Sequence, residues 1–431
     1  MLPVQFADRM KSQLQEDWPA FLSVYQEPAR RGARFFPEKA PDAAAALWAG
    51  LEAIPWAEDA FFLPADSELG KTIAHEVGLV YLQEPSAMIP AEVLAAKPGE
   101  ILLDLCAAPG GKSTQIGRSM EGEGLLVCNE INPRRAQILS RNIERMGIES
   151  AVVTCEPPEK LARHWPEGFD GVLVDAPCSG EGMFRRDPES ISEWSPDKAL
   201  GCAERQRKIL DSAAALVRPG GRLVYSTCTF HTEENGKMAA WFCRAHPEFT
   251  PASFSFCGKE YPEGMETFYP HQIPGEGQFV AAFRKAGAGK ADLRFRSDEM
   301  KAGVQKLIRE ALPVRMPNLF QIGNRVFSLP LLPDLEGIRV LRAGLGICEL
   351  RERCLIPDHA LAMSCRAAGL SGVELSDEEA LRYLRGETLR AEGSGWLLAR
   401  CRGMSLGWGK VSQGVLKNHY PKGLRKNHLL P

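Results

Sequence analysis

None of the twelve cysteines stands in a CxxC pair, and they are spread along the chain instead of being gathered in a short framework. This spacing argues against a zinc ribbon and a dithiol redox motif, so we expect no metal site. No apolar run reaches the roughly 18 residues of a membrane-spanning helix, and the first residues lack the apolar stretch of a secretion signal. We therefore expect a soluble, cytoplasmic protein with reduced thiols and no membrane partner.

The chain also lacks an excess of positive charge. It has 52 Lys and Arg against 55 Asp and Glu, a net charge of −3, so any affinity for nucleic acid must come from local patches. Its 431 residues are too many for one compact domain and favour two or three.

Two nucleotide-binding fingerprints are incomplete in the segment "LLDLCAAPGGKST". A P-loop needs a glycine five residues before its Gly-Lys-Ser/Thr, and Cys106 occupies that position here. The G-x-G-x-x-G pattern is absent as well. These gaps disfavour a nucleotide triphosphatase. The turn alone does not show whether its glycines form a cofactor site or only allow a tight turn of the backbone.

Short apolar runs alternate with helical patterns from about residue 99. The predicted strands are 100–105, 124–129, 151–154, 169–174, 222–227 and 275–283. One helix is predicted from Asn132 to Gly147 and another from Ser195 to Pro219, each with a polar N-cap followed by proline. This alternation predicts an α/β domain in which helices cover both faces of a parallel sheet.

Acidic residues follow three successive predicted strands: Glu130, Glu156 and Asp175. The carboxyl ends of parallel strands form the edge at which such sheets bind ligands, and a carboxylate there can hold the ribose of a cofactor. Each acid alone is more simply explained as a helix cap or a solvated loop charge. Their recurrence at successive strand ends favours a site.

Two cysteines, Cys178 in "DAPCSG" and Cys228 in "YSTCT", follow predicted strands at the same edge. Free cysteine is often a buried packing residue, and we accept that interpretation for Cys106, Cys128, Cys155, Cys202, Cys243 and the four cysteines nearest the C-terminus. Turn residues surround these two, so we interpret both as functional. The residue pattern alone does not show which one is the nucleophile. A methyltransferase acting on exocyclic nitrogen would carry an aromatic residue in place of the Ala-Pro-Cys after Asp175, which this chain lacks.

Three segments, "DLCAAPGGKST", "DAPCSGEGMFRRDP" and "YSTCTFHTEENGK", resemble the signatures of the Nop/Sun family of RNA cytosine-5 methyltransferases. The resemblance extends to "GLVYLQEPSAMIP" near residue 80. "GWGKVSQGVLKNHYPKGLR" near the C-terminus resembles the PUA-like domain of the RsmF-like bacterial branch. The family has a Rossmann-like fold and uses S-adenosylmethionine.

The resemblance assigns the cofactor to the glycine-rich turn and to the three acids. The implied cofactor-binding residues are Cys106, Ala107, Ala108, Pro109, Gly110, Gly111, Lys112, Ser113, Glu130, Glu156 and Asp175. The family commonly has aspartate after the third strand, where this chain has Cys155-Glu156.

The family also implies how the thiols act. A thiolate that adds to carbon 6 of cytosine makes carbon 5 nucleophilic enough to take the methyl group. The resemblance makes Cys228 this nucleophile and gives Cys178 a part in product release. A proline before the nucleophile, as in DNA cytosine-5 methyltransferases, would point to Cys178 instead. Asp175 is the candidate to support cytosine N3. Lys112 either orients Asp175 or is an ordinary first-turn lysine.

A target base must leave its stack to reach a buried thiol, so the enzyme must hold the RNA. RNA contacts are predicted at two places. Arg185 and Arg186 follow Cys178 on a long loop. The segment from Arg400 to Pro431 has seven Lys or Arg, no Asp or Glu, and interleaved aromatic residues, a composition that suits RNA backbone and bases. Its predicted RNA-binding residues are Trp408, Lys410, Lys417, Lys422 and Arg425.

We therefore predict five regions. They are a mostly helical RNA-binding region (1–95), the Rossmann-like catalytic domain (96–285), a linker (286–293), an intermediate α+β or β domain (294–370) and a PUA-like RNA-binding domain (371–431).

The predicted function is cytosine-5 methylation of small-subunit ribosomal RNA by a monomer. Transfer RNA as the substrate and a non-catalytic RNA-binding assembly factor remain the alternatives. Retention of both thiols argues against the second of these.

Overall fold

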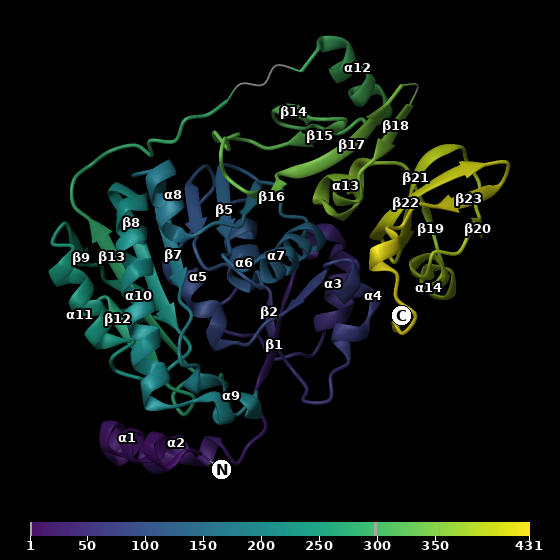
Figure 1. Ribbon diagram of the computed structural model, residues 1–431. Helices are drawn as coiled ribbons and strands as arrows, with labels where there is room; N and C mark the ends of the chain where they lie inside the picture. Colours follow the sequence, from purple (N-terminus) through teal and green to yellow (C-terminus); the bar gives the residue numbers. More distant parts are fainter. Residues whose placement is uncertain (1, 297–299, 353) are drawn as a thin grey trace.

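The computed structural model describes residues 2–296, 300–352 and 354–431. A twisted sheet of nine strands forms its centre, with the path β12-β13-β8-β7-β4-β5-β6-β16 and β9 added beside β13. Figure 1 shows this sheet with a second lobe that the C-terminal residues build beside it. Among the described residues, no helix is long and apolar enough to cross a membrane.

Five parallel strands carry the site. They are β4 (Ile101–Asp104), β5 (Leu125–Asn129), β6 (Ala151–Thr154), β7 (Phe169–Asp175) and β8 (Val217–Thr227). Antiparallel β13 (Gln278–Lys285), β12 (Met265–Phe268) and β9 (Phe249–Pro251) extend the sheet beyond β8. All six predicted strands are present, and the predicted Rossmann-like α/β fold is confirmed. The strands are almost wholly buried because helices cover both faces.

The helices form two layers. One hydrophobic cluster joins one face of the sheet to α8 (Pro158–His164), α10 (Pro196–Leu216) and α11 (Gly236–Ala245). The other joins the opposite face to α5 (Ile89–Leu94), α6 (Gly111–Ser119) and α7 (Pro133–Met146).

The two predicted helix starts are confirmed by their caps. The side chain of Asn132 accepts hydrogen bonds from the backbone of Arg134 and Arg135 at the start of α7, and Ser195 accepts one from Lys198 at the start of α10. Helix α10 ends at Leu216, three residues before the predicted proline, because Val217 already belongs to β8.

The N-terminal region is less helical than predicted. Helices α1 (Val4–Leu14), α2 (Trp18–Val24), α3 (Pro41–Trp48) and α4 (Ile73–Glu76) are present, but a three-stranded antiparallel sheet lies among them. Its strands are β1 (Arg31–Phe35), β2 (Ala60–Leu63) and β3 (Val80–Leu82). These strands have three to five residues, are mostly buried and show little alternation of polar and apolar residues. Sequence periodicity therefore does not indicate them.

The C-terminal lobe contains two further sheets. The first comprises β14 (Leu319–Ile322), β15 (Arg325–Ser328), β17 (Leu345–Arg351) and β18 (Cys354–Pro357), with α12 (Ala302–Ala311) and α13 (His359–Met363) beside it. The second comprises β19 (Gly372–Glu374), β20 (Leu389–Arg390), β21 (Gly395–Cys401), β22 (Met404–Ser412) and β23 (Val415–Asn418), with α14 (Asp377–Arg385).

One strand within the predicted intermediate region belongs to the catalytic sheet. Strand β16 (Val340–Ala343) pairs antiparallel with β6 and so completes the catalytic sheet. Residues 294–370 therefore do not form a wholly separate unit, which corrects the prediction. Four residues are too short a run to be assigned to a distant sheet from sequence periodicity.

Candidate active site

A cavity of about 500 Å³ opens at the carboxyl ends of β4 and β7. It is lined by Asp104, six residues of the glycine-rich turn and its helix, and Asp175. The segment after β3 and the loop after Cys178 complete its wall; the lining residues there include Tyr81, Gln83, Met183 and Arg186. A larger cavity of about 670 Å³ lies near the far end of α6, and its lining includes neither Asp175 nor any residue from Cys106 to Ser113. The smaller cavity is therefore the candidate active site.

The glycine-rich turn is held close to the sheet. The N–H of Ala107 donates to the carbonyl of Asn129, 2.8 Å away, and Gly110 has a φ of 114°. A Cβ atom at Gly110 would also lie 3.1 Å from Leu139. Glycine is needed at this position because other residues rarely adopt such a φ and because α7 packs against the turn.

Asp104 is a site residue that the sequence analysis missed. Its Oδ2 accepts a hydrogen bond from Ser113 at 2.6 Å, while its Oδ1 is buried with no hydrogen-bond partner among the described residues. Burial raises the pKa of Asp104 to about 7. The signal was present, because Asp104 ends β4 as Asp175 ends β7. An unsatisfied carboxylate oxygen beside a cavity suits a ligand that carries N–H groups.

Lys112 and Asp175 form an ion pair with 2.8 Å between Nζ and Oδ2. The other oxygen of Asp175 accepts a hydrogen bond from Ser226 at 2.7 Å and a longer one from Gln278. Burial lowers the pKa of Lys112, but the charge and hydrogen bond of Asp175 outweigh it and raise the pKa above its ordinary value. Of the two readings of Lys112, this contact favours the orienting one.

The two cysteines lie together as predicted from their strand ends. The Sγ atoms of Cys178 and Cys228 are 3.3 Å apart, and both residues are half-buried. The hydrogen bond with Cys228 and burial raise the pKa of Cys178 well above its ordinary value. A Cys178 thiol that keeps its proton can donate a hydrogen bond to the sulfur of Cys228. Burial likewise raises the pKa of the Cys106 thiol.

Two of the predicted cofactor acids are already engaged. Glu130 accepts a hydrogen bond from the N–H of Asn132 and pairs with Arg135, 3.2 Å away. Glu156 accepts a hydrogen bond from the N–H of Arg339 at 2.7 Å, just before β16, and pairs with Lys160. Neither carboxylate lines the 500 Å³ cavity. Their cofactor roles therefore rest on the resemblance alone.

Two of the predicted RNA contacts are buried and engaged within the protein. The guanidinium of Arg185 is buried in an ion pair with Glu276, 2.7 Å away, with side-chain exposures of 9% and 4%. Trp408 is buried, and its indole N–H donates to the carbonyl of Asp358 at 2.8 Å. Sequence context cannot show that a basic residue faces a buried carboxylate or that an aromatic residue on a strand faces the core.

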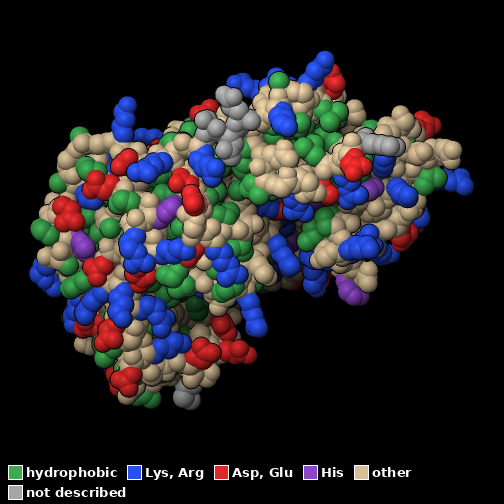
Figure 2. Space-filling view, turned by 45° about the horizontal axis from the view of Figure 1, so that its top comes forward, with side chains coloured by type: hydrophobic (Ala, Val, Ile, Leu, Met, Phe, Trp, Pro, Cys, Tyr) green, Lys and Arg blue, Asp and Glu red, His purple; other side chains and the backbone are tan. Residues whose placement is uncertain are grey.

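The remaining predicted RNA contacts are exposed: Arg186, Lys410, Lys417, Lys422 and Arg425. Lys410 lies over the ring of Trp396, which the sequence analysis did not single out, and His419 packs edge-on against the same ring. Figure 2 shows Lys and Arg side chains clustered on the lower side of the C-terminal lobe in that view.

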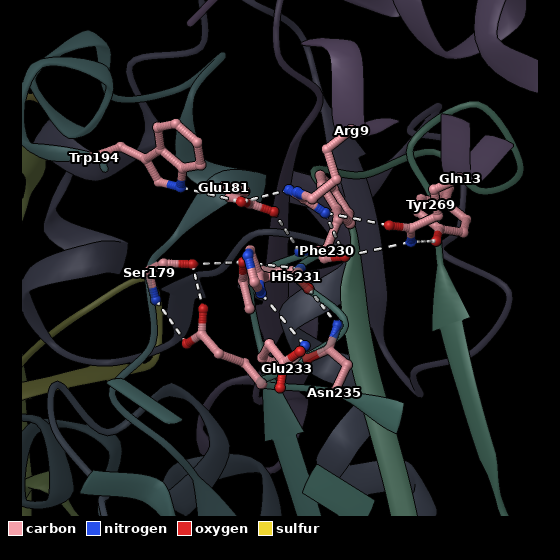
Figure 3. Close-up of polar contacts among 12 residues, drawn as sticks. Arg9, Gln13, Ser179, Glu181, Trp194, Phe230, His231, Glu233, Asn235 and Tyr269 are labelled. Carbon is pink, nitrogen blue, oxygen red and sulfur yellow. Dashed lines mark hydrogen bonds and ion pairs between the residues drawn. The ribbon is translucent and has the colours of Figure 1, made fainter. Parts of the chain in front are cut away.

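The loops that carry the cysteines are also tied to the N-terminal helices (Figure 3). Glu181, three residues after Cys178, pairs with Arg9 of α1 at 2.6 Å and accepts the N–H of Phe230, two residues after Cys228. Gly182 approaches Cys228 so closely that a Cβ atom would lie 2.8 Å from the Cys228 carbonyl. Helix α1 therefore helps to hold both loops.

Models of four RsmF-related families match successive parts of the chain. The N-terminal domain of 16S rRNA methyltransferase RsmF matches residues 2–85, and 16S rRNA methyltransferase RsmB/F matches residues 91–284. The first C-terminal domain of RsmF rRNA methyltransferase matches residues 306–365, and the RsmF PUA domain matches residues 371–426. The ribosomal RNA small subunit methyltransferase F of Citrobacter koseri is 33% identical over 98% of this chain and 97% of its own length.

The chain belongs to the RsmF branch of the RsmB/F methyltransferase family. The enzyme of the same name from Escherichia coli strain SE11 is 32% identical, again over 98% of this chain and 97% of its own. Membership confirms the predicted class of S-adenosylmethionine-dependent RNA cytosine-5 methyltransferase.

Two solved structures share the fold. A methyltransferase homologue from Pyrococcus horikoshii is 27% identical, covers 65% of this chain and 94% of its own, and has a TM-score of 0.57. NSun6 from the same organism, solved with the S-adenosylmethionine analogue SFG, is 20% identical with a TM-score of 0.56 and covers 66% of this chain and 99% of its own. The second comparison supports the fold only.

The contrast between two adjacent arginines is testable. Arg185→Ala would leave the Glu276 carboxylate buried without its partner, which costs about 3–5 kcal/mol. We expect the thermal unfolding midpoint to fall by at least about 6 °C. Arg186→Ala removes an exposed side chain with no ion pair among the described residues, so its midpoint should stay within about 1–2 °C. Equal midpoints for the two variants would contradict the burial argument.

Proposed function

We propose that this chain methylates carbon 5 of cytosine in the 16S rRNA of the small ribosomal subunit, with Cys228 as the nucleophile. The observation that carries the proposal is the pair of sulfur atoms 3.3 Å apart, close to the Lys112–Asp175 ion pair at the same edge of the sheet. Full-length similarity to enzymes named ribosomal RNA small subunit methyltransferase F supports ribosomal RNA as the substrate. A cytoplasmic, monomeric enzyme is part of the proposal.

The roles of the two thiols are assigned as the family resemblance implies. The Cys228 thiolate adds to carbon 6, and the electron pair of the C5–C6 double bond moves towards carbon 5 and the N3 side of the ring. S-adenosylmethionine, when bound, supplies the methyl group to carbon 5. A base then removes the proton from carbon 5, the C5–C6 double bond re-forms, and the C6–S bond breaks. Cys178, beside the leaving sulfur, assists this release.

Asp175 and Lys112 would act on the ring nitrogen as a pair. Asp175 accepts hydrogen bonds from Lys112 and Ser226, so its carboxylate is held rigidly. Charge that develops at N3 during attack needs a nearby proton donor. The ammonium group of Lys112, oriented by Asp175, can supply one.

The cavity fits a ligand with a charged amino-acid end. The unpartnered oxygen of Asp104 is suited to an ammonium group, as S-adenosylmethionine has, and the turn from Cys106 to Ser113 would surround the rest of that end. Glu130 would hold the ribose and Glu156 the adenine, as the family resemblance implies. Exposed Arg186, Lys410, Lys417, Lys422 and Arg425 would contact RNA.

Variants of the two cysteines test the covalent mechanism. Cys228→Ala should abolish transfer of radioactive methyl groups to 16S rRNA and give no protein–RNA adduct. Cys178→Ala should keep the attack and lose the release, so an adduct that survives denaturing gels should accumulate. An adduct that depends on Cys178 would reverse the assignment. Retained RNA binding with no methyl transfer by the wild-type protein would favour the assembly factor.

Cofactor affinity should depend on pH through Asp104. Because burial raises its pKa to about 7, the carboxyl is mostly protonated at pH 6 and mostly ionised at pH 8. A cationic ligand favours the ionised form, so S-adenosylmethionine should bind about ten-fold more tightly at pH 8 than at pH 6. Calorimetry can measure this. Asp104→Asn should weaken binding and remove the pH dependence; a dependence that persists in Asp104→Asn would contradict the assignment.

The basic face of the last sheet should contribute to RNA affinity through phosphate contacts. Replacing both Lys410 and Lys417 with alanine should weaken binding of 16S rRNA fragments and flatten the slope of affinity against salt concentration by up to about two. Filter binding at several salt concentrations can measure both effects. The conserved-charge variant with arginine at both positions is the control and should bind like the wild type. An unchanged salt slope in the alanine variant would place the RNA elsewhere.

A further inference from the structure

The carboxylate of Glu234 joins the loop of one catalytic cysteine to the loop of the other. It is fully buried six residues after Cys228, just before α11. One oxygen accepts the hydroxyl of Ser179, and the other accepts the N–H of Ser179 at 3.0 Å and the amide of Gln206 at 2.8 Å. Ser179 directly follows Cys178, so this carboxylate holds the chain beside that thiol.

A second contact closes the link between the two loops. The hydroxyl groups of Ser179 and Thr229 lie 2.7 Å apart, and Thr229 directly follows Cys228. Figure 3 shows Ser179 with its dashed contacts towards the loop that contains Phe230 and Asn235. The residues after the two cysteines are thus hydrogen-bonded to each other, and the sulfur atoms before them are 3.3 Å apart.

The two loops depend on Glu234 to different degrees. Cys228 follows β8 directly and has other supports: Asn235 accepts the hydroxyl of Thr227 and donates to the carbonyl of Thr229, and Gly182 donates to the carbonyl of Cys228. In the turn at Cys178, the N–H of Ser179 donates to the Glu234 carboxylate. The carbonyl of Pro177 accepts a hydrogen bond from the amide of Gln206, which also donates to Glu234. Loss of the carboxylate therefore disturbs the Cys178 side more than the Cys228 side.

We propose that Glu234 is a positioning residue for the release step, because it keeps the Cys178 thiol against the sulfur of Cys228 through Ser179 and Thr229. The inference rests on the proposed function, in which Cys228 attacks and Cys178 assists release. Without the carboxylate, Cys228 still attacks the base, but Cys178 no longer reaches the C6–S bond in time. The enzyme then stops as a covalent adduct.

A glutamine at this position can keep the same geometry. Its amide oxygen can accept from the N–H of Ser179 and from Gln206, while its NH₂ group donates to the Ser179 hydroxyl, which then donates to Thr229. Glu234→Gln therefore preserves the positions with two hydrogen bonds reversed, those of the Ser179 hydroxyl with residue 234 and with Thr229, whereas Glu234→Ala removes the link. The two variants separate positioning from simple loss of a buried residue.

The test measures methyl transfer and adduct together on 16S rRNA that lacks the modification. Glu234→Ala should slow turnover at least about ten-fold, as expected for a misplaced reacting group, and should accumulate the adduct that Cys178→Ala accumulates. Glu234→Gln should turn over like the wild type without adduct. Glu100→Ala is the matched control, because that carboxylate accepts hydrogen bonds from Lys97 and Arg222 at the opposite edge of the same sheet; it should give no adduct.

Thr229→Val keeps the side-chain shape and removes only the linking hydroxyl, so it should raise the adduct even if Glu234→Ala does not fold. Adduct levels like those of the wild type in Glu234→Ala or, where that variant does not fold, in Thr229→Val overturn the inference. A folded Glu234→Ala variant that neither transfers methyl groups nor forms the adduct also overturns the inference. So does a Glu234→Gln variant whose turnover falls as far as that of Glu234→Ala. Failure of Cys178→Ala to accumulate an adduct contradicts the proposed function itself, and the inference falls with it.

Discussion

The pairing of β7 with β8 is the constraint on which the active site depends. These neighbouring parallel strands place Asp175 opposite Ser226 in register, and each strand then runs directly into a loop that carries a cysteine. Fifty residues of chain, including the whole of α10, separate the two thiols in sequence, yet the register brings their sulfur atoms within 3.3 Å. A slip of the register would separate Asp175 from Ser226 and Cys178 from Cys228 at the same time.

Buried carboxylates turn this alignment into a fixed geometry. Glu234 holds the residues next to the thiols, and Glu181 holds the residues just beyond them and connects them to α1 through Arg9. A buried carboxylate is costly unless its hydrogen bonds are satisfied, so each strongly favours the one arrangement that supplies its partners. The N-terminal helices therefore contribute to the active site although none of their residues lines its cavity.

Local chemistry made some features predictable from sequence. Asn132 and Ser195 are helix caps whose role depends only on the next few residues, and apolar runs such as 169–174 are long enough to identify buried strands. Features that depend on distant partners were not predictable. The sequence around Arg185 does not indicate its ion pair with Glu276, and the sequence around Trp408 does not indicate its hydrogen bond to Asp358. Asp104 could have been found by extending the strand-end argument to the first strand.

The pairing of β16 with β6 connects the C-terminal lobe to the catalytic sheet. Strand β16 belongs to the catalytic sheet. The backbone N–H of Arg339, just before β16, donates to the carboxylate of Glu156, just after β6. The chain passes from there into β17 and on to the basic face of the last sheet. The segment that leads to the proposed RNA-binding face is thus anchored within the sheet that carries the thiols. Under the proposed function, the C-terminal lobe would hold its basic face at a set distance from Cys228, and this distance would limit which cytosines of a bound RNA can reach the sulfur.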